Sequence, residues 1–158
     1  MEKDIKKQKI EIEKLTTGLI DEPLTIEVTE STDYEITAKV SGMQFKRKII
    51  FLFKSDGIHS DISIKLALDN KSDIDIEAVV VIPDVFRECA STLSLRALLL
   101  DQYSKISFTP SLEINNISAS ADHHSTIGVP NKGQIEYLQS RGLTEAECIG
   151  LIADSFLV

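Results

Sequence analysis

The sequence predicts an all-β body that ends in a short pair of helices. Apolar and polar residues alternate with a period of two through much of residues 23–82, as in strands that are buried on one face. Polar turn clusters, such as Ser41-Gly42 and Ser55-Asp56-Gly57, separate the alternating runs, and no helical pattern intervenes. Short strands without intervening helices are typical of a β-sandwich or a β-helix, and periodicity alone does not choose between the two folds.

The predicted strands follow one another closely up to residue 128. Two runs, residues 48–53 and 77–82, are apolar almost throughout and predict strands that are covered on both faces. Residues 84–94 show no regular pattern. The other strands are expected near residues 24–28, 36–40, 62–68, 74–76, 95–100, 106–108, 112–114 and 117–121.

Before and after this body lie two segments of different character. Residues 1–22 are dominated by Lys and Glu and predict a charged, solvated arm or an edge strand, while residues 23–128 form the β core. Residues 129–158 predict a helical hairpin. Its first helix begins at Asn131 with Gln134 in a capping-box arrangement and ends near Gly142. Its second helix begins with a Thr144–Glu147 capping box and carries one apolar stripe of Cys148, Leu151, Ile152 and Phe156.

Composition excludes several classes of protein. The chain of 158 residues fits one domain, and its formal net charge of −8 argues against nucleic-acid binding and against an anionic membrane surface. Two cysteines are too few for a disulfide framework, no secretion signal is recognisable, and the apolar runs are too short to span a bilayer. We therefore expect a cytoplasmic protein with reduced thiols and with neither nucleic-acid nor membrane partners.

The pair His123-His124 is the most obvious candidate for chemistry. Successive side chains of a strand point to opposite faces, so the two imidazoles cannot easily bind one metal ion. Asp122 shares a face with His124 and can orient it, which leaves a small His/Asp hydrolase as one alternative, although no nucleophile accompanies the pair. The preceding strand shrinks to Ser and Ala at residues 117–121, as at an assembly edge or a tight turn. Phosphate-loop, dinucleotide, zinc-protease and nucleophile-elbow motifs are absent, so we do not expect an enzyme.

Four short motifs in the last part of the chain carry a family resemblance. His-His-Ser-Thr-Ile-Gly occupies residues 123–128, and Tyr-Leu-Gln-Ser-Arg-Gly occupies residues 137–142. Upstream lie Arg-Ala-Leu-Leu-Leu at 96–100 and Pro-Ser-Leu-Glu-Ile at 110–114. Together they resemble the C-terminal core of the SufB/SufD family, in which a His-Gly-Ala-Thr or His-Glu-Ala-Thr box precedes a Tyr-Leu-x-Ser-Arg-Gly box. The clear match covers about residues 95–156.

The resemblance implies a fold, a function and partners. SufB/SufD cores are right-handed parallel β-helices, so the resemblance favours a mainly β protein of that fold with a C-terminal two-helix hairpin. It implies a scaffold or partner subunit of SUF iron–sulfur cluster assembly, here in a short stand-alone form without the family's usual long N-terminal region. The hairpin would dock a SufC-type ABC ATPase, and the β-helix would pair with a second copy or with a SufB/SufD-like subunit. The expected partner-binding residues are Tyr137, Leu138, Arg141, Gly142, Leu151 and Phe156.

The same resemblance singles out candidate metal ligands. His123 matches the family histidine near the junction of two β-helix subunits, where the cluster is thought to be built, and is the first candidate, at a dimer contact. Cys89 is the second, although a small structural thiol is the more typical role for it, and Cys148 is expected to pack. SufB-like members carry a Cys just before the Leu-Leu-Leu segment, whereas residues 94–97 here read Ser-Leu-Arg-Ala. His124 stands where SufB-like members carry Glu and SufD-like members carry Gly. We therefore expect no cofactor in the isolated chain and at most a transient iron–sulfur cluster in a complex. An interaction module that has lost cluster assembly is the alternative.

Overall fold

The computed structural model describes residues 5–16 and 22–158. In this part of the chain it contains nine strands and three helices. The strands are β1 (Lys6–Lys9), β2 (Leu24–Val28), β3 (Thr32–Ser41), β4 (Gln44–Phe53), β5 (His59–Asp69), β6 (Asp73–Ile82), β7 (Ala90–Leu99), β8 (Lys105–Ile114) and β9 (Ser120–Gly128). The helices are α1 (Glu13–Thr16), α2 (Lys132–Ser140) and α3 (Glu145–Leu157).

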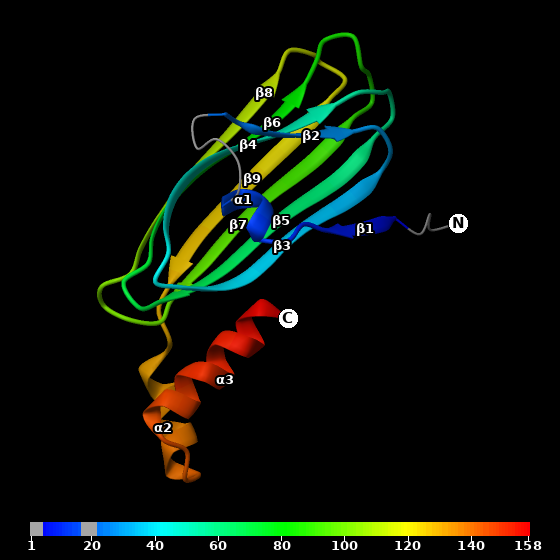
Figure 1. Ribbon diagram of the computed structural model, residues 1–158. Coiled ribbons are helices and arrows are strands. Elements are labelled where there is room, and N and C mark those ends of the chain that lie inside the picture. Colours follow the sequence, from blue (N-terminus) through cyan, green and yellow to red (C-terminus); the bar gives the residue numbers. More distant parts are fainter. Residues whose placement is uncertain (1–4, 17–21) are drawn as a thin grey trace.

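The strands alternate between two parallel sheets. Sheet A has the order β1-β3-β5-β7-β9 and sheet B the order β2-β4-β6-β8, and every neighbouring pair is parallel. The chain therefore passes from one sheet to the other and back, and it advances by one strand position with each coil (Figure 1). The result is a parallel β-helix of about four turns with a C-terminal helical hairpin, which confirms the predicted fold class and excludes the sandwich.

The core consists of inward side chains that stack from coil to coil. In sheet A, Ile36, Ile64 and Leu95 lie in one line because parallel neighbours keep a constant register. All three are at most 1% exposed. Phe51 and Phe53 fill the interior from sheet B, and the ring of Phe51 lies 5.7 Å from that of Tyr34 in sheet A. Side chains with a period of two thus become one continuous apolar interior.

Polar side chains hold the corners between the sheets. At one corner the Asp101 carboxylate accepts hydrogen bonds from the backbone amides of Tyr103 and Ser104, both at 2.7 Å, and from the Ser104 hydroxyl at 2.9 Å. Partial burial acts to raise the pKa of Asp101, but these hydrogen bonds together lower it below its ordinary value. The Ser104 hydroxyl in turn accepts from the backbone amide of Ser72 in the preceding coil, at 3.1 Å. The corners therefore stack as the strands do.

Four expectations about the strands were wrong in detail. Of the run expected at 117–121, only Ser120 and Ala121 belong to a strand, β9, and residues 117–119 lie in the preceding loop. The runs at 74–76 and 77–82 form the single strand β6, and the separate runs at 106–108 and 112–114 join in β8 across Pro110. β7 begins at Ala90, within the region that shows no regular pattern. The alternation of apolar and polar residues is hidden there because the inward position 91 is a serine. Its hydroxyl donates to the backbone carbonyl of Ser60 at 2.9 Å, and this hydrogen bond allows its burial.

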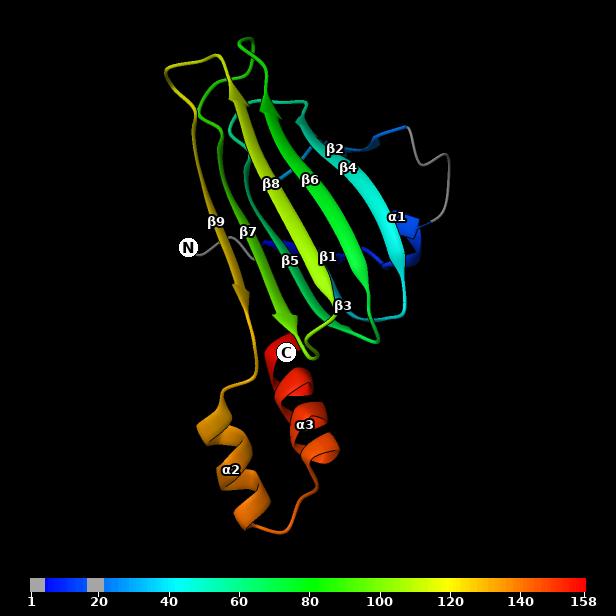
Figure 2. The ribbon, with the colours of Figure 1, turned by 90° about the vertical axis from the view of Figure 1, so that its left-hand side faces the viewer.

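The outer face of sheet B also differs from expectation. Ile50, Leu52 and Val81 point outward there and are only half-buried, and no described helix lies across them (Figure 2). Val79 is also an outward residue of β6, and it is only 1% exposed. The inner face of these strands is thus covered by the core, whereas their outer apolar face is shielded only by neighbouring side chains.

The two ends of the β-helix are closed differently. At the N-terminal end, within the segment predicted as an arm or edge strand, β1 pairs with β3 and the side chains of Ile10 and Leu15 cover the core. The rest of that segment, residues 1–4 and 17–21, lies outside the described residues. At the other end, β8 and β9 pair on one side only. None of the described helices has the length and apolar character that crossing a bilayer requires.

The stacked core predicts a large loss of stability when an inward side chain is shortened. Ile64 is 0% exposed, so Ile64→Ala should lower the free energy of unfolding by about 2–5 kcal/mol. Ile117 lies on a loop and is fully exposed, so Ile117→Ala should change it by less than about 0.5 kcal/mol. Urea unfolding of the two variants measures both effects. Equal effects of the two substitutions would contradict the stacked core.

Candidate functional site

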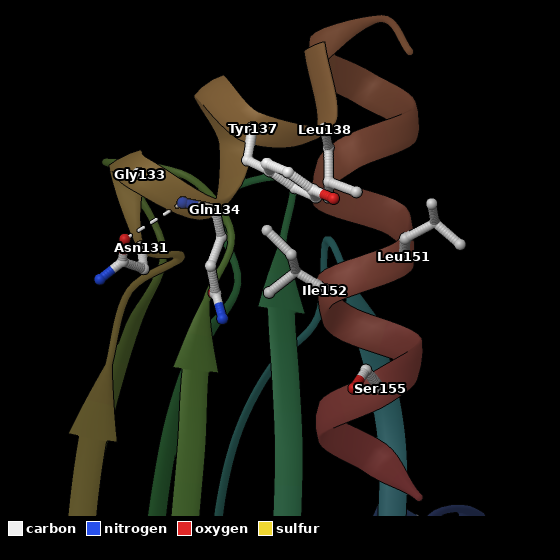
Figure 3. Close-up of a pocket in the computed structure, with 8 residues that line it drawn as sticks. All are labelled: Asn131, Gly133, Gln134, Tyr137, Leu138, Leu151, Ile152 and Ser155. Carbon is white, nitrogen blue, oxygen red and sulfur yellow. Dashed lines mark hydrogen bonds between the residues drawn. The ribbon is translucent and has the colours of Figure 1, made fainter. Parts of the chain in front are cut away.

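The first helix of the hairpin is held at its start by one side chain. The side-chain carbonyl of Asn131 accepts a hydrogen bond from the backbone amide of Gln134 at 3.2 Å, as predicted. The reciprocal half of the expected capping box does not form, because the side chain of Gln134 extends toward the ends of the strands instead (Figure 3). Since the side chain of Gln134 does not take part in the cap, it lines the groove described below.

The Tyr-Leu-Gln-Ser-Arg-Gly box builds the end of α2. Gly142 has φ +96°, and its amide and that of Leu143 donate to the carbonyls of Gln139 and Leu138, which is the Schellman ending expected for glycine at this position. The guanidinium of Arg141 donates to the Tyr137 hydroxyl at 3.2 Å and lies 5.3 Å from the centre of its ring. The box thus ends the helix and fixes the orientation of the tyrosine that it presents.

The second helix begins with the predicted capping box. The backbone amide of Thr144 donates to the Glu147 carboxylate at 2.7 Å, the Thr144 hydroxyl does so at 2.8 Å, and the backbone amide of Glu147 lies 3.4 Å from the same hydroxyl. The amide bond from Thr144, followed by the hydroxyl bond, lowers the pKa of Glu147. A carboxylate that is held in the charged form caps the positive end of the α3 dipole.

Only part of the expected apolar stripe of α3 faces the β-helix. Ile152 and Phe156 pack on the outer face of sheet A, against Ala67 and Leu98, and Arg96 stacks 5.3 Å from the Phe156 ring. Ala153, which the stripe did not include, is 0% exposed at the centre of this contact. This helix contact on sheet A could have been predicted from the strands, because Ala67 and Leu98 are apolar at outward positions where most neighbours are polar. Small residues at positions 67 and 153 let helix and sheet approach closely.

Of the two other stripe residues, Cys148 is buried, and Leu151 is one of the residues that line a groove between the two helices (Figure 3). The groove has a volume of about 620 Å³, and its most exposed apolar side chains are Tyr137, at 59%, and Leu151, at 50%. Leu138 and Ile152 form its floor between them. Of the six residues expected to bind a partner, the structure therefore brings Tyr137, Leu138 and Leu151 together. Arg141 and Gly142 lie beyond the groove at the end of α2, and Phe156 lines a smaller adjoining cavity of about 240 Å³.

The histidine pair lies on the last strand of sheet A. His123 aligns with Leu93, Ile62 and Tyr34, so it occupies an inward line, yet it is exposed because no further strand follows. His124 lies on the outward face. Within the part of the chain that the structure describes, no hydrogen bond joins Asp122 to His124, so the geometry gives the hydrolase hypothesis no support.

The structure does not bring His123 and the cysteines together. Cys89 is 1% exposed, and its thiol donates to the Ser55 carbonyl at 3.4 Å. It precedes Leu93, the register partner of His123, by four residues, which corresponds to about 13 Å along the strand. Cys148 is 0% exposed and packs in the hairpin. Among the described residues, no group of three or more His, Cys, Asp or Glu side chains is placed to hold a metal ion.

Comparison with known families identifies this arrangement. The model of the SufBD core domain, described as SUF system FeS cluster assembly, matches residues 24–156 and so spans the β-helix and both helices of the hairpin. The chain belongs to the SufBD family. This family membership supports a role in iron–sulfur cluster assembly and confirms the resemblance that the four motifs carry.

Individual SufBD relatives match over a shorter stretch. Iron–sulfur cluster assembly SufBD family proteins of Mycobacterium bovis and Mycobacterium tuberculosis are 31% identical to this chain over 67 residues. That stretch is 42% of this chain and 8% of each relative. The matched part is therefore a small fraction of those mycobacterial proteins.

The capping box of α3 predicts a pH-dependent contribution to stability. Because folding lowers the pKa of Glu147, its contribution is fully present above the unfolded value, about 4.3, and is lost as the pH falls through the lower folded value. The difference in stability between the native chain and Glu147→Gln should therefore shrink on acidification. Thermal unfolding across this pH range measures it. Glu145→Gln removes a charge from the same helical turn and serves as control; an equal pH dependence in both variants would refute the assignment.

Proposed function

We propose that this SufBD chain is a scaffold or partner subunit of iron–sulfur cluster assembly that docks a SufC-type ABC ATPase through its hairpin. The observation that carries the proposal is the groove between α2 and α3. Its apolar lining includes Tyr137 and Leu138 of the Tyr-Leu-x-Ser-Arg-Gly box, the motif that resembles the family's hairpin. The chain acts in this proposal as a binding surface, and catalysis belongs to the ATPase.

The shape of the groove suits a protein partner. The groove combines the apolar side chains of Tyr137, Leu138, Leu151 and Ile152 with the polar side chains of Asn131, Gln134 and Ser155, and Tyr137 and Leu151 are 59% and 50% exposed. An apolar centre with a polar rim is the usual anatomy of a protein interface, and tyrosine is frequent among the residues that dominate binding energy. The fixed ring of Tyr137 reduces the entropy that a partner must remove on binding.

Leu151 offers the most direct test of the groove. Leu151→Lys should weaken binding to the ATPase at least about tenfold, because burial of a leucine contributes roughly 1.5–3 kcal/mol and each 1.4 kcal/mol is a factor of ten. The measurement is a titration of the co-expressed or purified SufC-type ATPase against the full chain. Leu151 is half-exposed, so the substitution should leave the fold intact.

The matched control is Ile117→Lys, which adds the same charge at a fully exposed aliphatic residue on the loop between β8 and β9. It should bind as the native chain does. Unchanged binding by the Leu151 variant, together with native stability, would exclude the groove as the docking site.

The second part of the proposal concerns the open end of the β-helix. We propose that β8 and β9 contact a second SufBD-type subunit, because half-buried core residues such as Phe108 and Leu112 lie there without a following coil. His123 faces this end, so a contact between two subunits brings two imidazoles to one place. The nascent iron–sulfur cluster is then a cargo held between subunits, with ligands from more than one chain.

One observation favours a second candidate function. Both cysteines are buried, and the thiol of Cys89 is engaged by a backbone carbonyl, so neither is presented to a cluster. This favours an interaction module that keeps the fold and the ATPase dock without cluster assembly. Both candidates share the groove, and they differ in whether iron is bound in the complex.

The ligand geometry predicts that the isolated chain holds no stable cluster. Anaerobic reconstitution of the purified chain should give iron and sulfide near background, since His123 and Cys89 are about 13 Å apart along the strands. The same assay with the ATPase and a second SufBD subunit present separates the scaffold from the interaction module. A stoichiometric cluster in the pure monomer would contradict the prediction.

A further inference from the structure

The outer face of sheet B carries an aliphatic patch at its centre. Ile50 and Leu52 of β4 point outward there, and their register partners on β6 are Val79 and Val81. These four side chains, named the sheet B patch from here on, are neighbours because residues two apart share one face of a strand. Val79 is buried among the other three, which are half-buried. No described helix lies across the patch (Figure 2).

The outer face of sheet A shows how this protein treats outward apolar side chains. Ala67 and Leu98 point outward from sheet A, and both are at most 8% exposed because α3 packs on them. Most of their outward neighbours are polar, so the helix lies where the sheet is apolar. The sheet B patch holds four aliphatic side chains without such a cover among the described elements. Aliphatic side chains gathered on one exposed face mark an interaction site.

Charged side chains border the patch in a fixed order. The Nζ of Lys48 lies 2.8 Å from a carboxylate oxygen of Glu77, and that of Lys46 lies 2.9 Å from one of Asp75. Both lysines belong to β4 and both carboxylates to β6, at matching register positions. One column of the face is therefore positive and the next is negative. A partner that fits this face presents the two columns in the opposite order.

A second copy of the chain presents that order. Sheet B has four strands in the order β2-β4-β6-β8, so its middle lies between β4 and β6. A two-fold axis that runs parallel to the strands through this middle places β4 of each copy over β6 of the other. Each aliphatic side chain of β4 then faces a valine of the second copy, and Lys48 faces the second copy's Glu77. Every lysine of the border thus lies between two carboxylates, and the contact is made twice.

We propose that the sheet B patch binds a second copy of this chain, with the two B sheets packed face to face and β4 of each copy over β6 of the other. Aligned packing at about 10 Å is the usual geometry for two sheets that share an apolar interior. The contact lies on the side of the β-helix, apart from the hairpin groove and from the open end. It is therefore independent of the proposed function.

The same register also creates one unfavourable pair at the rim. Glu27 of β2 and Glu113 of β8 lie in the row of Leu52 and Val81, at the two edges of the sheet. In the face-to-face contact, Glu27 comes opposite the second copy's Glu113. Lys54 lies 3.4 Å from Glu27 and offsets part of this repulsion. The pair provides a test in which a substitution strengthens the contact.

The aliphatic centre is tested by Leu52→Lys. Sedimentation at micromolar concentration should give the native chain at least twice the mass of this variant, because the contact would bury an unpaired ammonium group. The control Thr92→Lys adds the same charge on the outer face of sheet A and should sediment as the native chain does. Thermal unfolding checks that both variants are folded. Equal masses for the native chain and Leu52→Lys would overturn the contact.

A charge exchange tests the copy-to-copy pairing without disturbing either chain. The double variant Lys48→Glu/Glu77→Lys keeps an ion pair within each chain, and two such chains face each other with opposite charges, so it should associate with itself as the native chain does. Mixed with the native chain, it faces like charges twice and should not form mixed dimers. Native mass spectrometry of the mixture measures this. Free mixing of the two chains would show that the pairs act only within one chain and would overturn the register.

Glu113→Lys tests the register from the opposite direction. It replaces the repulsion with Glu27 by an attraction that is made twice, so self-association should strengthen at least about twofold. The gain should vanish when Leu52→Lys is added, whereas an effect exerted at the open end would persist. Unchanged or weaker association of the Glu113→Lys chain, measured by sedimentation equilibrium, would overturn the proposed alignment of β2 over β8.

Discussion

Every part of this molecule depends on coil-to-coil stacking. In a parallel β-helix, an inward side chain is buried when the coils before and after it, or a segment that covers the end of the stack, supply its neighbours. Ile64 has such neighbours in Ile36 and Leu95 and is fully buried. His123 has one on one side only and is exposed. The interior is therefore stable in the middle of the stack, and the two ends must be completed by something else.

The two ends meet this requirement in different ways. The N-terminal end uses Ile10 and Leu15 to cover the core, and a short lysine-rich strand to close the sheet edge. The C-terminal end keeps long edges and half-buried apolar side chains such as Phe108. Exposed strand edges and apolar side chains favour aggregation unless a partner covers the open end. The proposed subunit contact lies at this open end of the stack.

The sequence predicted those features whose cause is local, and it missed those that arise from contacts distant in the chain. The capping box at Thr144 and the glycine ending at Gly142 were predictable because each involves residues a few positions apart. The start of β7 was missed because Ser91 is buried through a bond to the preceding coil. Periodicity could not distinguish a sandwich from a β-helix, since both bury alternate residues. The motifs made that choice.

The candidate site was predictable to the same extent. The hairpin box named Tyr137 and Leu138, but no local pattern showed that Leu151 and Ile152 of α3 line the same groove, with Ile152 also packed on sheet A. That arrangement depends on where α3 crosses sheet A. Ala67 and Ala153 decide the crossing because only small side chains allow the close approach. The groove is thus a consequence of helix-on-sheet packing, which sequence reasoning on the hairpin alone could not reach.

The two surfaces of the proposed function are joined by one strand. β9 ends at Gly128 and α2 begins at Lys132, so only a short connection through Pro130 separates the strand edge from the groove. The strand is also an edge strand of sheet A, paired on one side only. The proposed subunit contact at this strand would restrain its backbone and, through the short connection, the start of α2. Because Asn131 lies both at that start and in the wall of the groove, order at the proposed subunit contact should favour order at the proposed ATPase surface. Assembly at the open end and docking at the hairpin are therefore expected to reinforce each other, with the same sign in both directions.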